Sequence, residues 1–419
     1  KTRRLAEANR LDDAAAEAAA RLLHSQDPFV RGITEWALAM KVGGENNKQD
    51  IVWPRKAAPE WFAAWQAGAT QHAVVNDWGR QAVSRGLHVN PKALQGDLAD
   101  IVARLAHMRR DWLRHGAELA RLAQAETALL ALAQRMGNAP RASRQLWLEA
   151  RMILRPLVLA HPLVDFEQLV CVERSTSHTT RNITRSYPWK HKPGGDICRV
   201  SWKKGEADRL LAGRLGPGFV WGMDLWWDGD RVVFGYSRLP TWPPPFNTAT
   251  ANGEGQNVFR LRKLYEPLHI FELNLATKQV EQLTDDPVWN DFEPTYLANG
   301  DVVFSSDRCA RAAECGNVTY DHLNPNLYLR EAATGRVRHF TDNKDIDRYP
   351  HSLDDGRVGY THWEYQERHF MEVHALWSAR PDGTQSDALF KHHMRAPLAM
   401  RDVRSIPGVA DLVATATGH

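Results

Sequence analysis

A histidine-rich segment after residue 360 contains the side chains best suited to bind a metal ion. His362, Glu364, His369 and His374 supply imidazole nitrogens and a carboxylate, which are common donors to zinc and related transition metals. Their spacing matches no established metal-binding motif. We therefore treat the three histidines as weak metal candidates. Trp363 and Glu364 are candidates for contacting a ligand, although packing inside a sheet is the favoured interpretation of Trp363.

A second group of candidates is basic and lies in a loop expected between two strands. Binding residues concentrate in loops, so a histidine-containing basic loop could line a binding face. The alternative is an ordinary solvated polar loop. The members of the group are His178, Arg181, Arg185, His191 and Lys192.

Asp307 and Arg308 directly follow a strand-like Val-Val-Phe segment. At that place they could face a ligand in a central channel, or they could form a salt bridge inside their own sheet. The salt bridge is the favoured interpretation, and the ligand contact is the alternative.

Cysteine usage indicates neither a disulfide scaffold nor a standard metal site. The chain has four cysteines and lacks both C-x-x-C and C-x-x-C-H, so no zinc knuckle or covalent attachment site for a c-type haem is evident. Cys309 and Cys315 lie in one expected loop, where they could form a disulfide in an oxidising compartment or remain two free thiols. Cys171 and Cys198 are left unassigned.

Charge and motif content exclude several functional classes. Basic residues number 53 and acidic residues 50, which gives a net charge of +3 and no reason to expect a nucleic-acid partner. No apolar run approaches the roughly 20 residues of a membrane-spanning helix. A nucleophile elbow, a Walker loop and a dinucleotide fingerprint are also absent, so common hydrolase and nucleotide chemistry loses support.

The elements that must position these residues change in character near residue 160. Before it, apolar residues recur at helical spacing, and one stripe predicts a single long helix that ends at Gly137 and Asn138. A second helix over residues 142–154 is expected to stop before Pro156, which predicts a helical hairpin over residues 89–160. The stripe comprises Leu98, Ile101, Leu105, Met108, Trp112, Leu119, Leu122, Leu129 and Leu132.

The first 88 residues are expected to form a separate helical region. Asp27 is suited to cap a helix, and Pro28 is suited to its first position. The segment that follows resembles the start of a HEAT-type repeat helix, although only one copy is visible.

After residue 160 the periodicity falls to two, which indicates β-strands. Three repeats align on the turn residues Gly229, Gly300 and Gly356, each followed by a strand-like segment. One such sheet cannot bury both of its faces, whereas several sheets packed around an axis can. We therefore predict a β-propeller over residues 161–419 with about four blades visible, and we expect the full protein to continue beyond them.

The repeats resemble the TolB-like propeller repeat through residues 294–308. More closely, residues from about 162 onward, about 60% of the chain, resemble the middle domain of the hydrazine synthase alpha subunit. The matching segments are residues 162–169, 292–309, 363–365, 376–377, 381–384 and 406–408. The resemblance implies an exported, envelope-associated protein, periplasmic or extracellular, with six or seven blades in full. It implies haem chemistry only for true synthases, and the missing attachment motif argues for transfer of the fold and not of the activity.

The predicted fold class is therefore multidomain: an α-helical region with a HEAT-like pair and a long helical hairpin, followed by an incomplete β-propeller. The favoured function is binding of a protein or glycan partner, with oligomerisation through the helical hairpin as a further hypothesis. The alternative is a propeller module of a haem- or metal-dependent oxidoreductase whose cofactor lies outside these residues. No cofactor is evident within them.

Overall fold

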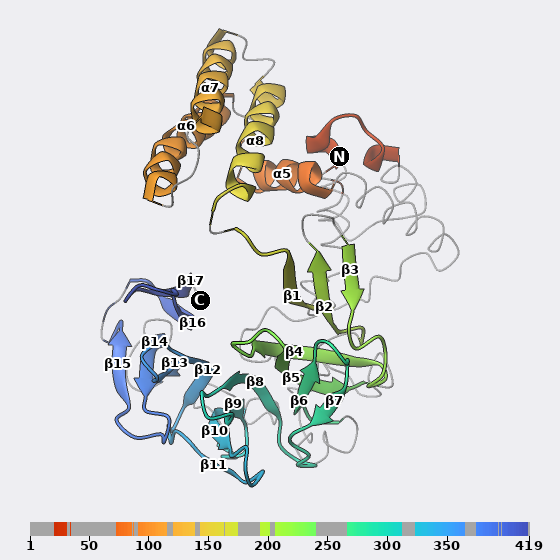
Figure 1. The fold of residues 1–419 in the computed structure, drawn as a ribbon, viewed down its shortest axis with the longest axis vertical. Coiled ribbons are helices and arrows are strands. Elements are labelled where there is room, and N and C mark those ends of the chain that lie inside the picture. The colour runs from red at the N-terminus through yellow and green to blue at the C-terminus, as the bar shows by residue number, and fades with distance from the viewer. Residues whose placement is uncertain are drawn as a thin grey trace, which may run out of the picture. The chain divides into compact units, whose positions relative to one another are not determined.

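The computed structural model describes residues 21–31, 34, 73–85, 87, 91–114, 120–138, 143–162, 164–174, 193–201, 206–239, 266–311, 323–364, 374–392, 394 and 396–417. The chain divides into two compact units, Lys1–Glu167 and Gln168–His419. The described part of the first unit is helical, and that of the second is built from β-sheets (Figure 1).

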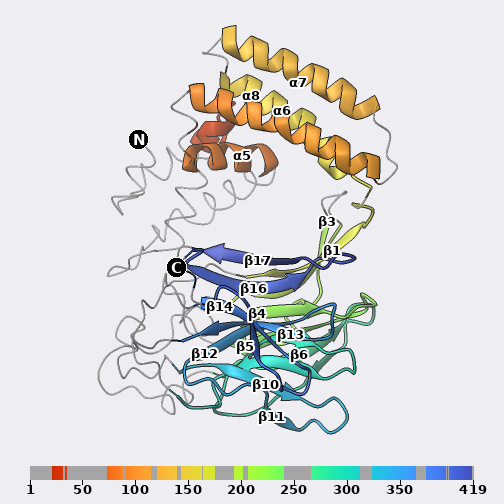
Figure 2. The ribbon, with the colours of Figure 1, turned by 90° about the vertical axis from the view of Figure 1, so that its left-hand side faces the viewer.

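Four helices organise the described part of the first unit: α5 (Ala73–Ser84), α6 (Pro91–Arg114), α7 (Ala120–Asn138) and α8 (Ser143–Leu159). Helices α6, α7 and α8 all pack against one another (Figure 2). Upstream, the backbone N–H of Phe29 donates to Asp27 Oδ1 at 2.9 Å, so Asp27 caps a helical turn as predicted. In the described part of the chain, no helix combines the length and apolar character needed to cross a membrane.

The predicted apolar stripe forms the core of this unit, but it lies on two helices. Its buried members are Leu98, Ile101, Leu105, Trp112, Leu122, Leu129 and Leu132. The prediction of one long helix was wrong, because α6 ends at Arg114 and α7 begins at Ala120. The sequence between them contains Gly116, and glycine costs a helix interior about 1 kcal/mol. Because both helices turn their apolar faces to the same core, the apolar residues keep a helix-like spacing in the sequence from α6 into α7.

The predicted stop before Pro156 was also wrong, because α8 continues through Pro156 to Leu159. A proline interrupts a helix by removing one N–H donor and by crowding the preceding turn. Leu157 is buried in the core of the unit, and its packing holds the last turn in place. One carboxylate, Asp97, is also buried in this unit, where it accepts a hydrogen bond from Trp147 Nε1 at 2.7 Å.

The described strands of the second unit form four sheets in which neighbouring strands are almost all antiparallel. The first contains β1 (Gln168–Glu173), β2 (Asp196–Ser201) and β3 (Glu206–Arg209). The second contains β4 (Gly218–Leu225), β5 (Arg231–Arg238), β6 (His269–Asn274) and β7 (Val280–Gln282). The third contains β8 (Asp291–Tyr296), β9 (Val302–Ser306), β10 (Asn326–Arg330) and β11 (Val337–His339). The fourth contains β12 (Ile346–Ser352), β13 (Val358–Trp363), β14 (His374–Ala379) and β15 (Asp387–Phe390), extended by the hairpin of β16 (Ala399–Ser405) and β17 (Leu412–Thr417).

The inner strands show how these sheets are arranged. Strand β1 contacts β4, β4 contacts β8, β8 contacts β12, and β12 contacts β16. The first strands of the four sheets therefore pack against one another in chain order, and β16 continues the series after β12; this is the arrangement of β-propeller blades around an axis. Figure 1 shows the sheets following one another around a common centre. The predicted propeller architecture is confirmed for the described strands, whereas the total number of blades stays a prediction.

The turn glycines that defined the repeats have the conformation that the hairpins require. Gly229, Gly300 and Gly356 have φ values of 68°, 88° and 84°. Glycine reaches this left-handed region without the steric penalty that a Cβ atom brings. The strand after each turn has a buried valine as its first or second residue: Val232, Val302 and Val358.

Candidate functional site

The four inner strands β4, β8, β12 and β16 share a backbone irregularity. Each has a register shift of the β-bulge type against its neighbouring strand. At each shift one residue has positive φ: Gly222 at 76°, Glu293 at 55°, Tyr349 at 56° and Asp402 at 54°. A bulge bends its strand and redirects the side chains that follow it. Equivalent bulges therefore turn equivalent side chains of successive inner strands toward the common axis.

The residues two positions after these bulges come together and are named the axial cluster: Asp224, Thr295, His351 and Arg404. Asp224 Oδ2 accepts a hydrogen bond from Thr295 Oγ1 at 2.8 Å. Asp224 Oδ1 lies 3.7 Å from His351 Nδ1 and 3.9 Å from Arg404 Nη1. Strands β8 and β12 lie between β4 and β16 in the order of inner strands, so Asp224 and Arg404 meet although their strands are not neighbours in that order.

The acidic and basic members of the cluster differ in exposure. The side chain of Asp224 is 11% exposed, whereas that of Arg404 is 42% exposed. Arg404 Nη1 lies 3.2 Å from His351 Nδ1, and Arg404 Nη2 lies 3.2 Å from Asp402 Oδ1. Burial lowers the pKa of His351, and the Arg404 charge lowers it further, so the uncharged imidazole is favoured at neutral pH. The cluster therefore places the Arg404 guanidinium, which is paired with Asp402, beside a neutral imidazole.

A buried ion pair next to the cluster joins three consecutive sheets and is named the Glu293 hub: Glu293, Arg348, Trp221 and Ser305. The Glu293 carboxylate pairs with the Arg348 guanidinium, and both side chains are 6% exposed. Trp221 Nε1 donates to Glu293 Oε1 at 2.9 Å, and Ser305 Oγ donates to Oε2 at 2.9 Å. Because Glu293 occupies the bulge of β8, the hub fixes the part of the strand that aims Thr295 at the axis.

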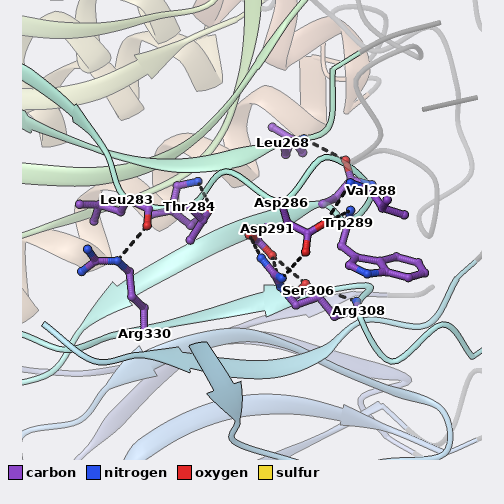
Figure 3. A network of polar contacts seen from close by, with 12 residues as sticks. Leu268, Leu283, Thr284, Asp286, Val288, Trp289, Asp291, Ser306, Arg308 and Arg330 are labelled. Carbon is purple, nitrogen blue, oxygen red and sulfur yellow. Dashed lines mark hydrogen bonds and ion pairs between the residues drawn. The ribbon is translucent and has the colours of Figure 1, made fainter. Parts of the chain in front are cut away.

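Asp307 and Arg308 lie outside the axial cluster, and both contact residues in β8 or in the segment before it. Arg308 Nη2 forms an ion pair with Asp291 Oδ2 at 2.6 Å, and Nη1 forms one with Asp286 Oδ2 at 2.8 Å (Figure 3). Asp307 is buried and accepts hydrogen bonds from the backbone N–H and the side-chain Nδ2 of Asn290, each at 2.8 Å. These contacts tie β9 to β8 and to the segment before it. The structural interpretation of Arg308 as an ion-pairing residue holds, but its partners are Asp291 and Asp286.

The structure separates the histidine-rich candidates that it describes. His362 pairs in register with Ala375, while His374 pairs with Trp363. Register partners point to the same face of a sheet, so His374 shares a face with Trp363. Adjacent residues of a strand point to opposite faces, so His362 lies on the face opposite Trp363 and His374. The two histidines therefore do not form one metal site. Trp363 is 2% exposed and packs in the sheet, as the favoured interpretation held. Glu364 instead contacts His362, with Oε1 at 3.1 Å from Nε2.

The remaining candidates lie outside the described residues. They are His369, Cys315 and the basic loop residues His178, Arg181, Arg185, His191 and Lys192. Cys309 is a free thiol whose Sγ lies 2.8 Å from the carbonyl oxygen of Asn324, so the structure shows it unbridged, while its predicted partner Cys315 lies outside the described residues. Among the described residues, no group of three or more histidine, cysteine or acidic side chains is arranged to hold a metal ion.

His362 bridges two carboxylates, and this arrangement predicts a pH dependence of stability. Its Nδ1 lies 2.7 Å from Asp347 Oδ1, on the opposite side of the ring from Glu364. Burial alone would lower the pKa of His362, but Asp347 and then Glu364 outweigh that effect and raise the pKa above its usual 6.5. The protonated imidazole is thus favoured by folding. Its stabilisation is fully present below the unfolded-state pKa and is lost as the pH rises through the folded-state pKa.

The corresponding measurement compares the wild-type chain with a His362→Gln variant by denaturant unfolding at about pH 5.5 and about pH 8.5. We expect the variant to lose stability relative to wild type mainly at the lower pH, with the gap narrowing at the higher pH. A His351→Gln variant is the control, because a lowered folded-state pKa predicts the opposite trend. A stability gap for His362→Gln that does not vary with pH would contradict the assignment.

Neither the axial cluster nor the Glu293 hub was predicted from the sequence. A signal for the cluster exists in the repeats: Asp224, Thr295 and His351 each lie five residues before the turn glycine of their own repeat. Their side chains differ in type, so a search for catalytic patterns does not select them. They can be recognised as axial residues by their equivalent positions in the repeats, and not by the chemistry of their side chains.

Comparison with known proteins places no family name on the chain. No family model matches it, and no curated protein matches it. Solved structures similar to it include a putative TolB from Agrobacterium tumefaciens (14% identity, TM-score 0.31, covering 47% of this chain and 56% of that one). Hydrazine synthase from Kuenenia stuttgartiensis (13% identity, TM-score 0.42, 57% and 34% coverage) and oligogalacturonate lyase from Vibrio parahaemolyticus (13% identity, TM-score 0.32, 47% and 46% coverage) are also similar. This chain covers less than two thirds of each, and likenesses at this level say nothing of activity.

Proposed function

We propose that the second unit is a binding propeller of the cell envelope that recognises a protein or glycan partner through its axial cluster. The observation that carries the proposal is the convergence of equivalent positions from four inner strands on one polar cluster, with the Arg404 side chain left 42% exposed. Charged groups that converge at the centre of a propeller are suited to fixing one polar group of a ligand. The envelope location is supported by the resemblance of the repeat motifs.

The chemistry of the cluster favours a carboxylate on the partner. The guanidinium of Arg404 can donate two parallel hydrogen bonds to a carboxylate, a geometry that lysine does not offer. The neighbouring Asp224 already accepts hydrogen bonds from Thr295 Oγ1 and from the Tyr296 N–H, the latter at 3.0 Å. Its charge is therefore largely engaged within the propeller. An acidic peptide segment and a uronic-acid glycan both present the required group.

Arrays of acidic peptides and of acidic glycans test this proposal directly. An Arg404→Ala variant is expected to lose about 10- to 100-fold in affinity, since a hydrogen bond to a charged group contributes about 1.5–3 kcal/mol. The matched control is Arg336→Ala, which removes an exposed arginine that pairs with Glu331 beside the β10–β11 turn. Binding that Arg404→Ala leaves unchanged, or that Arg336→Ala weakens equally, would place the binding surface elsewhere.

Two further hypotheses stay open as proposals. The helical unit could serve as an oligomerising element, which the mass of the full chain in solution tests by light scattering. The alternative function, a propeller module of a haem- or metal-dependent oxidoreductase, is tested by an absorption spectrum and metal analysis of protein purified from its native host. A Soret band or a stoichiometric transition metal would support the oxidoreductase.

A further inference from the structure

Two cysteines that the sequence left unassigned lie opposite each other in the first sheet of the propeller. In the antiparallel pairing of β1 with β2, Cys171 is the direct partner of Cys198. Directly opposed residues of antiparallel strands point to the same face, and their Cα atoms are about 4.5 or 5.5 Å apart, depending on the type of pair. Both spacings fall within the range of about 4.4–6.8 Å that disulfides span. The backbone therefore brings the two thiols within bonding reach.

The side chains around the pair form a small polar cluster on that face. Glu173 lies two residues after Cys171 on β1, and its Oε2 accepts a hydrogen bond from Cys198 Sγ at 3.3 Å. Arg209, the register partner of Cys198 on β3, donates from Nε to the same Glu173 oxygen at 2.7 Å. Cys171 is exposed and Cys198 is buried, and both are free thiols. An external reagent therefore reaches the Cys171 thiol more readily than the Cys198 thiol.

We propose that Cys171 and Cys198 are a redox-active thiol pair, which a small-molecule disulfide such as oxidised glutathione converts into a cross-strand disulfide. This assignment is independent of the binding function proposed for the axial cluster. It adds a modification site at the strand with which the propeller unit begins. An oxidising compartment would hold the pair bridged, and a reducing one would hold it as two thiols.

The reaction proceeds by two thiol–disulfide exchanges. The Cys171 thiolate attacks one sulfur of oxidised glutathione, the S–S bond of the reagent breaks, and one glutathione thiolate leaves and takes up a proton. The Cys198 thiol then loses its proton, and its sulfur attacks the Cys171 sulfur of the mixed disulfide. A second glutathione leaves. In sum, two protein thiols are oxidised to one disulfide, and one glutathione disulfide is reduced to two thiols.

The second exchange is the slow one. Burial raises the pKa of the Cys198 thiol to about 12, and the hydrogen bond to Glu173 contributes to the rise. Only the thiolate is nucleophilic, so little of Cys198 is reactive at neutral pH. Removing the Glu173 charge while keeping Arg209 should lower the pKa of Cys198 and so increase the fraction of Cys198 that is thiolate. After allowance for the lower nucleophilicity of a more acidic thiol, the rate should rise roughly threefold for each unit by which the pKa falls.

The test uses the full chain with Cys309 and Cys315 both replaced by serine, treated with oxidised glutathione and mapped by mass spectrometry. We expect a cross-linked peptide pair containing Cys171 and Cys198, preceded by a glutathione adduct on Cys171. Cys198→Ser should accumulate the adduct without the cross-link. Glu173→Gln should form the cross-link at least about threefold faster, whereas Glu281→Gln, an exposed glutamate on β7, should not change the rate.

Two results would overturn the proposal. One is a glutathione adduct on Cys171 that persists without cross-linking, both in the chain with Cys309 and Cys315 replaced by serine and in the same chain carrying Glu173→Gln. The other is a cross-link that forms only between protein molecules and disappears on dilution. Because each result is read from peptide masses, the outcome does not depend on whether the axial cluster binds a partner.

Discussion

Replacing Glu293 with alanine is expected to lower the free energy of unfolding of the propeller unit by about 3–5 kcal/mol. The variant leaves the buried guanidinium of Arg348 without its counter-charge, and it removes the acceptor of the Trp221 and Ser305 hydrogen bonds. A buried charge without a partner has lost its hydration, and no ion pair compensates for that cost. The loss of stability therefore far exceeds the loss that follows when a surface pair is broken. Denaturant unfolding followed by tryptophan fluorescence measures the change.

Three companion variants separate the causes of that loss. Glu293→Gln keeps a hydrogen-bond acceptor and loses the charge, so its loss should be intermediate. Adding Arg348→Met to Glu293→Ala removes the unpaired charge, so the double variant should recover part of the stability. Glu331→Ala, which breaks an exposed pair with Arg336, should change little. A loss at Glu293→Ala no greater than at Glu331→Ala would show that the hub contributes no stability.

Substituting alanine for Gly222 is expected to destabilise the propeller by about 2–5 kcal/mol. Gly222 has a φ of 76°, which costs a residue with a Cβ about 1–2 kcal/mol. A Cβ placed there would also lie 2.7 Å from Glu293 Cα and 3.0 Å from Glu293 N. Because these are backbone atoms of the next inner strand, neither can move aside without displacing a bulge. The overpacking adds about 1–3 kcal/mol.

The matched control is Gly229→Ala in the β4–β5 turn. Gly229 also has positive φ, at 68°, but a Cβ there would meet no atom within 4 Å. Its loss should therefore be limited to the backbone penalty of about 1–2 kcal/mol. The difference between the two alanine variants, measured by denaturant unfolding, isolates the steric contact between the bulges of β4 and β8. Equal losses would mean that the two bulges are not packed together in solution.

Local patterns in the sequence predicted much of the fold. The apolar stripe from Leu98 to Leu132 identified the buried face of the first unit, because helix periodicity depends only on spacing along the chain. The same pattern could not show that the stripe is divided between α6 and α7, since both helices face one core. The turn glycines identified the hairpins, because positive φ is a property of a single residue.

The candidate site was less predictable for a different reason. The candidates chosen by chemical type led to structural contacts: Arg308 binds Asp291 and Asp286, and Trp363 packs in its sheet. Asp224 and Arg404 were not selected, because neither belongs to a recognised motif. Their significance depends on their position relative to a bulge, and a bulge is a property of strand pairing.

By itself, the sequence determined the helical and β halves of the chain, the repeats and the hairpin turns, all of which depend on local spacing and on single-residue conformational preference. Only the tertiary structure decided that Asp224, Thr295, His351 and Arg404 meet, and that Cys171 lies opposite Cys198. The physical reason is that sheet register and the packing of blades around an axis bring together residues far apart in the chain. Those contacts are set by the packing of the sheets, which no local pattern records.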